Sequence, residues 1–167
     1  KRFQVAEHRR GFVAAALSLV RRRYRTVKAL DGVSFTVRAG ELVGYLGPNG
    51  AGKSTTIKVL AGILVPTEGL VQVDGRVPWA DRKRHTQDIG VVFGQRTNLW
   101  WDLPVVESYD LLRHIYRIEP ARYATNLRHF TEMLDLGEIL ATPVRSLSLG
   151  QRMRADLAGA LLHEPAL

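Results

Sequence analysis

The sequence predicts an α/β fold in which most strands precede residue 98 and most helices follow it. Alternating apolar and polar residues at 33–37 and an apolar segment at 42–46 are typical of strands. A glycine-rich turn after 42–46 leads into a segment that opens as a helix near Ser54. Apolar residues at helical spacing then recur between 99 and 140. A strand, a turn and a helix in this order are typical of the α/β class.

Length and composition describe a globular domain. The chain has 167 residues, of which 46% are hydrophobic and 24% charged, so a sizeable core is expected and disorder is not. The absence of cysteine excludes a disulfide framework, a thiolate zinc site and a cysteine nucleophile. The formal charge of +8 suits a nucleic-acid binder, a protein on an anionic membrane or a nucleotide site, and does not choose among them.

The N-terminal part contains a basic segment with an apolar centre. Phe3–Val5 are interpreted as the end of a strand, and because no methionine comes first we expect the native chain to start earlier. We interpret residues 9–23 as a basic amphipathic helix or hairpin inserted near the edge of the domain, with membrane-surface contact as a weaker alternative. A twin-arginine export signal is disfavoured, because no small-residue cleavage site follows the apolar run.

Further strands and helices are predicted along the chain. Segments 70–73 and 89–93 are apolar, and the second is expected to be buried on both faces. The helix after the glycine-rich turn should end at Gly62, since glycine is favoured just after a helix. Pro104 and Pro120 each suit the first position of a helix.

The glycine-rich turn carries the strongest functional signal. It fits the phosphate-loop pattern Gly-x-x-x-x-Gly-Lys-Ser/Thr with Gly47, Pro48, Asn49, Gly50, Ala51, Gly52, Lys53, Ser54 and Thr55. Its glycines let backbone N–H groups approach an anion, and the following helix adds its positive dipole end. Lys53 is expected to reach the β- and γ-phosphates, and Ser54 to ligate Mg²⁺. The motif therefore predicts a binding site for a nucleoside triphosphate.

A second potential anion site precedes the last predicted helix. Residues 146–151 lead into a helical pattern with Ser148 as its expected N-cap, and Met153, Leu157 and Leu161 lie on one side of that helix. A serine and a glycine at a helix N-terminus suit an anion, and capping alone also explains them.

The order of these features resembles the nucleotide-binding domain of ABC transporter ATPases, over about residues 24–167. Two motifs carry the resemblance. The first is the phosphate loop, and the second is 147–151, which is similar to the family signature Leu-Ser-Gly-Gly-Gln with Leu149 in place of the first glycine. Segments 30–35 and 91–95 look like those of ATP-binding subunits of bacterial drug, antibiotic or polysaccharide exporters.

The resemblance implies a P-loop NTPase core with an N-terminal antiparallel β subdomain and a helical subdomain. Residues 1–98 would form the β subdomain and the P-loop core, 99–145 the helical subdomain, and 146–167 the signature motif and its helix. Because the family continues with further core elements, we expect the chain to be a fragment that lacks the C-terminal core.

The resemblance also implies roles for single residues. ATP and Mg²⁺ are the expected cofactors, with Lys53 and Gln95 in catalytic roles and Ser54 and Gln95 as metal ligands. Gln95 matches the family's Q-loop glutamine, which helps to hold Mg²⁺ and the attacking water. Tyr24 lies where the family keeps an aromatic residue that stacks on adenine.

The signature is expected to act on a second nucleotide-binding domain. In this family two domains meet head to tail, and the γ-phosphate held by the partner would be contacted by Ser148, Leu149, Gly150 and Gln151. Leu149 makes close approach harder, so weaker ATP-driven closure is expected. Trp100 and Trp101 lie where the family contacts its membrane subunit, and burial in the helical subdomain explains them equally well.

Two carboxylates that the family uses for Mg²⁺ and for the attacking water have no match here. Glu164 follows no apolar strand, and His163 is interpreted as the end of the signature helix, where positive charge is favoured. We therefore expect the whole protein to hydrolyse ATP and this segment alone to turn over negligibly, because phosphoryl transfer depends on positioning and electrostatics.

The leading hypothesis is an ATPase subunit on the cytoplasmic side of a bacterial cell membrane. It would work beneath a transmembrane permease that exports drugs, other small molecules or glycans, with no nucleic-acid partner expected. One alternative is a soluble ABC protein that acts on nucleic acid or the ribosome, where the +8 charge would be functional. Another is a non-hydrolysing ATP-binding scaffold, which Leu149 and the unmatched carboxylates favour.

Overall fold

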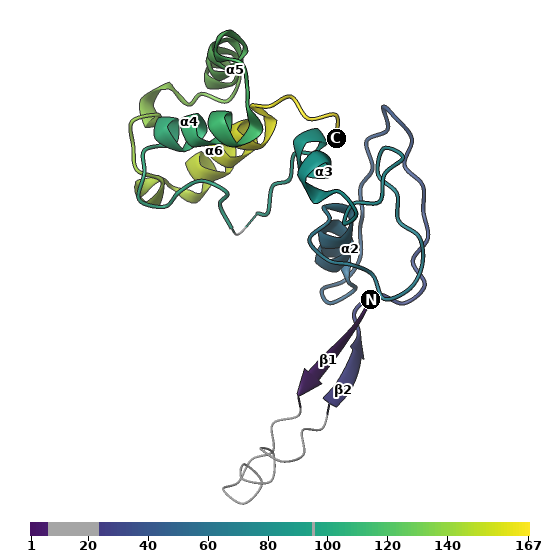
Figure 1. Cartoon of the computed structure of the whole chain (residues 1–167). Coiled ribbons are helices and arrows are strands. Elements are labelled where there is room, and N and C mark those ends of the chain that lie inside the picture. Colours follow the sequence, from purple (N-terminus) through teal and green to yellow (C-terminus); the bar gives the residue numbers. More distant parts are fainter. Residues whose placement is uncertain (7–23, 95) are drawn as a thin grey trace, which may run out of the picture. The chain divides into compact units, whose positions relative to one another are not determined.

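A computed structural model describes residues 1–6, 24–94 and 96–167 (Figure 1). These residues form two compact units, Lys1–Arg82 and Lys83–Leu167, which are described separately. The basic segment 9–23 and Gln95 lie outside the described residues. The described elements are β1 (Arg2–Ala6), β2 (Tyr24–Lys28), α2 (Lys53–Leu60), α3 (Arg82–Asp88), α4 (Val105–Tyr116), α5 (Pro120–Met133), the 3₁₀ turns η1 (Gly137–Ile139) and η2 (Val144–Ser146), and α6 (Leu149–Leu161).

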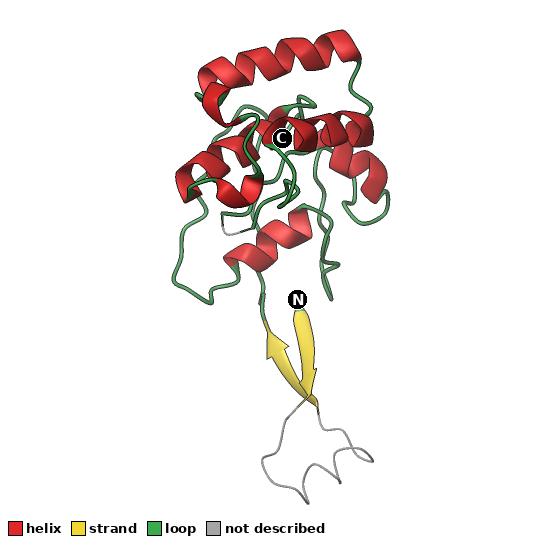
Figure 2. Ribbon diagram, turned by 90° about the vertical axis from the view of Figure 1, so that its left-hand side faces the viewer, coloured by secondary structure: helices red, strands yellow, loops and turns green. Residues whose placement is uncertain are grey.

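The first unit begins with an antiparallel hairpin (Figure 2, yellow). In β1, Phe3 lies opposite Val27 of β2, so the strand predicted at Phe3–Val5 is confirmed. The hairpin is joined to the rest of its unit at its open end. There Arg2 donates its backbone N–H to the Thr67 hydroxyl at 3.0 Å and pairs with the Glu68 carboxylate at 3.1 Å.

Four segments predicted as strands do not form strands in the described part of the chain. No strand ladder is formed by segments 33–37, 42–46, 70–73 and 89–93. Two residues of these segments form isolated bridges, Val73 with Arg76 and Phe93 with Arg96. An extended segment becomes a strand only when a neighbour accepts its backbone hydrogen bonds. An apolar pattern indicates an extended segment but does not identify that neighbour, and those strand predictions are wrong here for this reason.

The helix after the phosphate loop and its end follow the prediction. Helix α2 begins at Lys53, and Gly62 follows it with φ +72°, the left-handed conformation that glycine adopts without strain. Pro120 is the first residue of α5 as expected, whereas Pro104 is the N-cap of α4 and lies one position earlier than predicted.

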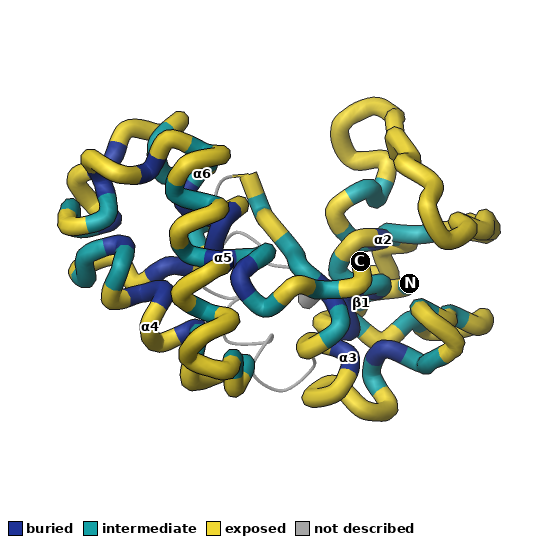
Figure 3. The backbone as a smooth tube through the Cα atoms, turned by 90° about the horizontal axis from the view of Figure 1, so that it is seen from above, coloured by how far each residue is buried: buried dark blue, intermediate teal, exposed yellow. Residues whose placement is uncertain are grey.

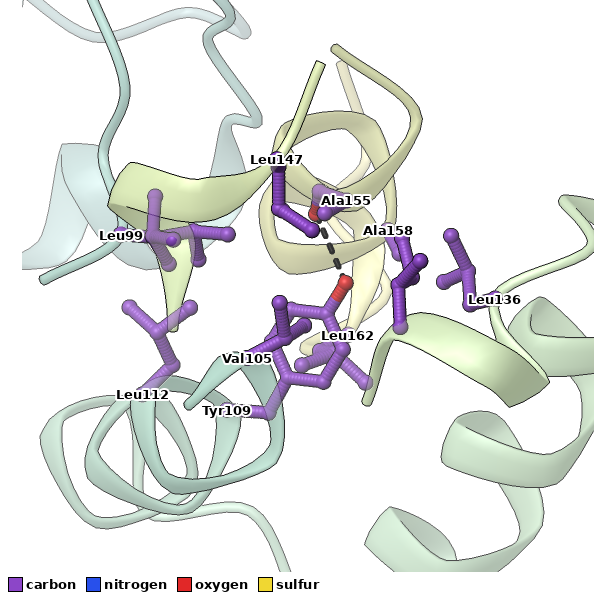
Figure 4. Packing of buried hydrophobic residues seen from close by; sticks show 11 residues of the cluster. Leu99, Val105, Tyr109, Leu112, Leu136, Leu147, Ala155, Ala158 and Leu162 are labelled. Carbon is purple, nitrogen blue, oxygen red and sulfur yellow. Dashed lines mark hydrogen bonds between the residues drawn. The ribbon is translucent and has the colours of Figure 1, made fainter. Parts of the chain in front are cut away.

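The second unit has a helical core built by α4, α6 and the turns between them (Figures 3 and 4). Its buried side chains are Leu99, Val105, Tyr109, Leu112, Leu136, Ile139, Val144, Leu147, Ala155, Ala158 and Leu162. Each fully buried large apolar side chain contributes about 1.5–3 kcal/mol. Figure 4 shows the ring of Tyr109 reaching α6, where its hydroxyl donates to the Ala155 carbonyl at 2.8 Å. The predicted helical character of 99–140 is confirmed.

The buried face of α6 consists of small residues. Ala155, Ala158 and Gly159 face the core, and a β-carbon on Gly159 would lie 3.2 Å from side-chain atoms of Leu99 and Leu112. Small side chains therefore let α6 approach these neighbours closely. The side with Met153 and Leu157, which the sequence singled out, is the exposed one.

Candidate phosphate-loop site

The phosphate loop packs against the end of β2 through Gly52. Gly52 has φ +89°, and a β-carbon there would lie 2.4 Å from the carbonyl oxygen of Ala29 and 2.7 Å from the Leu30 side chain. No other residue type fits such a contact without a shift of the backbone. The neighbour that requires a glycine at this position is the chain just after β2, and the predicted approach of the loop N–H groups to an anion stays a prediction.

Lys53 lies folded over the same loop. Its ammonium group donates to the carbonyl oxygens of Gly47 and Pro48, the second at 2.8 Å. The loop is closed further by Ala51, whose N–H donates to the Pro48 carbonyl at 3.2 Å. Carbonyl oxygens hold the ammonium in place, and a phosphate oxygen is a stronger acceptor of the same donors because it is charged.

A cavity of about 340 Å³ opens beside the loop within the first unit. Its lining residues are Val27, Lys28, Ala29, Asn49, Gly50, Gly52, Lys53, Ser54 and Thr55. This lining contains two lysines and no carboxylate, and the first residues of α2 present the helix N-terminus to it. The cavity is therefore electrostatically suited to an anion. Lys28 and Ala29 were not singled out from the sequence, since nothing local marks them.

Tyr24 does not line this cavity. It is 54% exposed and begins β2, three residues before Val27 and thus about 10 Å along the strand from it. The stacking role suggested for Tyr24 stays a prediction. Gln95 lies outside the described residues, so its roles with Mg²⁺ and water also stay predictions.

Ser148 caps α6, as the sequence predicts. Its hydroxyl accepts from the Gln151 N–H at 3.3 Å, and the Gln151 side-chain oxygen accepts from the Ser148 N–H at 2.9 Å, which forms a capping box. Leu149 is 58% exposed, and a β-carbon on Gly150 would meet nothing within 4 Å. The turn thus offers an open helix N-terminus.

The segment after Gln95 is anchored by a residue that sequence reasoning missed. Asp156, on α6, is only 5% exposed, and its Oδ1 accepts from the Thr97 hydroxyl and from the Asn98 N–H, both at 2.8 Å. An aspartate within a helical pattern reads as a solvent-facing residue, so no signal in the sequence marks this contact.

The tryptophan pair is half exposed, with Trp100 at 39% and Trp101 at 50%. The Arg152 guanidinium lies over the Trp101 ring, 5.3 Å from its centre. Next to this pair, the Asp102 carboxylate accepts from Arg145 at 2.7 Å. The pair is neither buried in the core nor free, because α6 and η2 hold its loop.

His163 is held by aromatic and backbone contacts in the second unit. Its ring stacks on Tyr116 at 3.9 Å, and Nε2 lies 3.2 Å from the Ile89 carbonyl oxygen. Burial lowers the pKa of His163, although the contact with Ile89 acts in the opposite direction. Burial therefore disfavours the protonated imidazole, and the positive charge expected at this helix end stays a prediction.

Within residues 1–6, 24–94 and 96–167, no cluster of three or more histidine or carboxylate side chains is placed to hold a metal ion. None of the helices in these ranges has the length and apolar character needed to cross a bilayer.

Comparisons with known proteins agree on one family. The family model described as "ABC transporter" matches residues 30–167. The Nod factor export ATP-binding protein I of Ralstonia nicotianae is 35% identical over 87% of this chain and 45% of its own length. The ribose import ATP-binding protein RbsA of Rhodopirellula baltica is 41% identical over 81% of this chain and 27% of its own length.

A solved structure supports the same family. The ATP-binding cassette MJ0796, described as a dimer in a post-hydrolysis state bound to ADP and Pi, has a TM-score of 0.71 and 27% identity over 97% of this chain and 68% of its own chain. The chain spans about half or less of the length of the two curated relatives. The family model covers most of the chain, and the chain therefore belongs to the ABC transporter ATP-binding family.

Proposed function

We propose that this chain binds MgATP at the loop 47–55 as part of a subunit that couples ATP hydrolysis to transport. The observation that carries the proposal is the cavity lined by Lys28, Lys53 and the first residues of α2. The cavity is lined by two cationic side chains and the positive end of a helix. The phosphate loop beside it packs against the end of β2 through Gly52. This donor set suits a triphosphate.

Each residue of the loop then has a physical task. Lys53 would exchange the carbonyls of Gly47 and Pro48 for phosphate oxygens, and its charge would offset the charge that develops during transfer. We propose that Mg²⁺ is held by Ser54, which lines the cavity, and by Gln95. Mg²⁺ supplies charge neutralisation between the phosphates when it is bound.

The signature turn is proposed to serve a second copy of the cassette. Ser148, Leu149, Gly150 and Gln151 stand at an exposed helix N-terminus, which suits an anion presented by another chain. The dimeric structure of the cassette MJ0796 supports this arrangement. The second unit would then act as a movable partner for a nucleotide held by the first unit of the other copy.

Export is the proposed direction of transport, with drugs, other small molecules or glycans as cargo. The Nod factor export protein supports export, and the ribose import protein shows that the family also contains importers. A transmembrane permease is the proposed partner on the cytoplasmic side of the membrane. The half-exposed Trp100 and Trp101 are proposed to lie at its interface, since aromatic residues are enriched in such contacts.

The decisive experiment is ATP binding by the full-length protein with Lys53→Ala. Lys58→Ala is the matched control, because Lys58 is in the last turn of the same helix and does not line the cavity. We expect Lys53→Ala to weaken MgATP binding by about tenfold or more, in line with the loss of a charge-assisted hydrogen bond, and Lys58→Ala to leave it unchanged. Equal effects of both substitutions would refute the site. The direction of transport is then measured by following labelled cargo into or out of inverted membrane vesicles.

A further inference from the structure

We propose that Asp156 is a positioning residue that fixes the segment after Gln95 to the signature helix, so that both move as one body during ATP hydrolysis. The expected effect on ATP hydrolysis rests on the proposed function, whereas the contacts of Asp156 are present without any ligand. All the contacts that carry it lie within the second unit.

The backbone N–H groups of segment 97–100 are hydrogen-bonded mainly by side chains. It belongs to no helix or strand, yet three consecutive N–H groups donate to side chains. Asn98 donates to Asp156 at 2.8 Å, Leu99 to the Thr97 hydroxyl at 3.1 Å, and Trp100 to the Ser108 hydroxyl at 3.2 Å. Side chains from α4 and α6 thus set the path of this segment.

Burial makes the contact with Asp156 strong. A carboxylate that is 5% exposed requires hydrogen-bond donors, because an unsatisfied buried charge is costly. Its Oδ1 receives two donors, one from the Thr97 hydroxyl and one from the Asn98 backbone. Charge-assisted bonds of this kind are roughly twice as strong as neutral ones. The Asn98 side chain adds a further link, since it donates to the Val91 carbonyl at 2.9 Å.

The position of Asp156 gives the contact its consequence. It lies eight residues after Ser148 on the same continuous helix, about 12 Å along the axis, so the signature turn and residue 156 are rigidly connected. At the other end, Thr97 lies two residues after Gln95 and three before Trp100. A displacement at the tryptophan pair would therefore be transmitted through Thr97 and Asp156 to the signature turn.

The test is a set of substitutions at Thr97 in the full-length protein. Thr97→Val keeps the shape of the side chain but removes the hydroxyl that donates to Asp156 and accepts from Leu99, whereas Thr97→Ser keeps it. We expect Thr97→Val to lower kcat for ATP by about tenfold and to leave the Kd for MgATP within about twofold, because the phosphate loop belongs to the other unit. Thr97→Ser should restore turnover.

Two further variants separate positioning from simple stability. Asp135→Ala is the control: its carboxylate also contacts α6, through Arg154 at 3.1 Å, but at the surface, and it should leave kcat unchanged. Asp156→Ala is measured alone and in combination with Thr97→Val. The double variant should have a kcat no lower than that of the slower single variant, as expected for the two partners of one contact. Additive losses, or a kcat per folded molecule for Thr97→Val equal to that of the unaltered protein, would overturn the proposal.

A readout without ATP keeps the two proposals distinguishable. Amide hydrogen exchange at Asn98, Leu99 and Trp100 should be slow in the unaltered protein and at least about tenfold faster at Leu99 in Thr97→Val. If the unaltered protein hydrolyses no ATP, the proposed function fails and exchange alone decides the positioning role. Unchanged exchange in Thr97→Val would refute that role whatever the ATPase result.

Discussion

The carbonyl oxygen of Ala29 lies 2.4 Å from the point where Gly52 would carry a β-carbon. This contact joins the turn after β2 to the start of α2 and shapes the floor of the proposed ATP cavity. The loop is thus held by its packing against β2 as well as by its own hydrogen bonds.

Gly52→Ala is predicted to damage this site. The new methyl group would clash with Ala29 and Leu30 while the residue keeps a positive φ, so we expect a loss of about 1–3 kcal/mol of stability and weaker ATP binding. Thermal unfolding and nucleotide titration measure the two effects. Gly44→Ala is the control, because a β-carbon there meets nothing within 4 Å and φ is not in the left-handed region. Equal tolerance of both substitutions would contradict the packing described.

Tyr109 makes the stability of the second unit depend on alkaline pH. Burial raises the pKa of its hydroxyl above the usual range, and the nearby Asp156 carboxylate raises it further. A tyrosine in the unfolded chain ionises at about pH 10, whereas folded Tyr109 keeps its proton at that pH. The contribution of Tyr109 to the free energy of unfolding is therefore fully present below about pH 10 and is lost as the pH rises further. Burial also raises the pKa values of Tyr116 and Tyr123, which act in the same direction.

Tyr109→Phe tests this dependence. At neutral pH the substitution should cost about 1 kcal/mol, because the hydrogen bond to the Ala155 carbonyl is lost. Urea unfolding between about pH 8 and pH 11 should then show a shallower decline in the variant than in the unaltered protein. A decline of the same slope in both would mean that Tyr109 does not carry the effect.

Arg152 and Trp101 are predicted to be energetically coupled. The guanidinium lies 5.3 Å from the ring centre at a half-exposed site, so the coupling energy should be about 0.5–1 kcal/mol. A double-mutant cycle with Arg152→Gln and Trp101→Leu, followed by chemical unfolding, measures it. The same cycle with Trp100→Leu is the comparison and should give a value near zero.

The local parts of the site could be predicted from the sequence because their physics is local. The loop 47–55 needs glycine, lysine and serine at set positions before a helix, and the Ser148 cap needs a serine and a glutamine three residues apart. The strands predicted at 42–46 and 89–93 are not formed in the structure, because a strand depends on a partner distant in sequence that a local pattern does not identify.

The sequence did not indicate which face of α6 is buried. Helical periodicity places Met153, Leu157 and Leu161 on one side of the helix, and of these Met153 and Leu157 are exposed. The buried side carries Ala155, Asp156, Ala158 and Gly159, which hydropathy does not mark as core. What decides the face is how closely α4 can approach, and this depends on small size and on a hydrogen-bonded carboxylate.

Ser148→Asp separates the structural role of the signature turn from its proposed function. Aspartate is as good an N-cap as serine, and its negative charge interacts favourably with the helix dipole, so Ser148→Asp should preserve the stability of α6. Ser148→Ala should instead cost about 0.5–2 kcal/mol. In the proposed dimer, however, the new carboxylate would face the γ-phosphate of the other copy and repel it. We therefore expect Ser148→Asp to melt like the unaltered protein and to lose ATP-dependent dimerisation, as measured by light scattering with and without MgATP. Dimerisation that survives in Ser148→Asp would show that this helix N-terminus does not meet a phosphate, and that capping alone accounts for the serine.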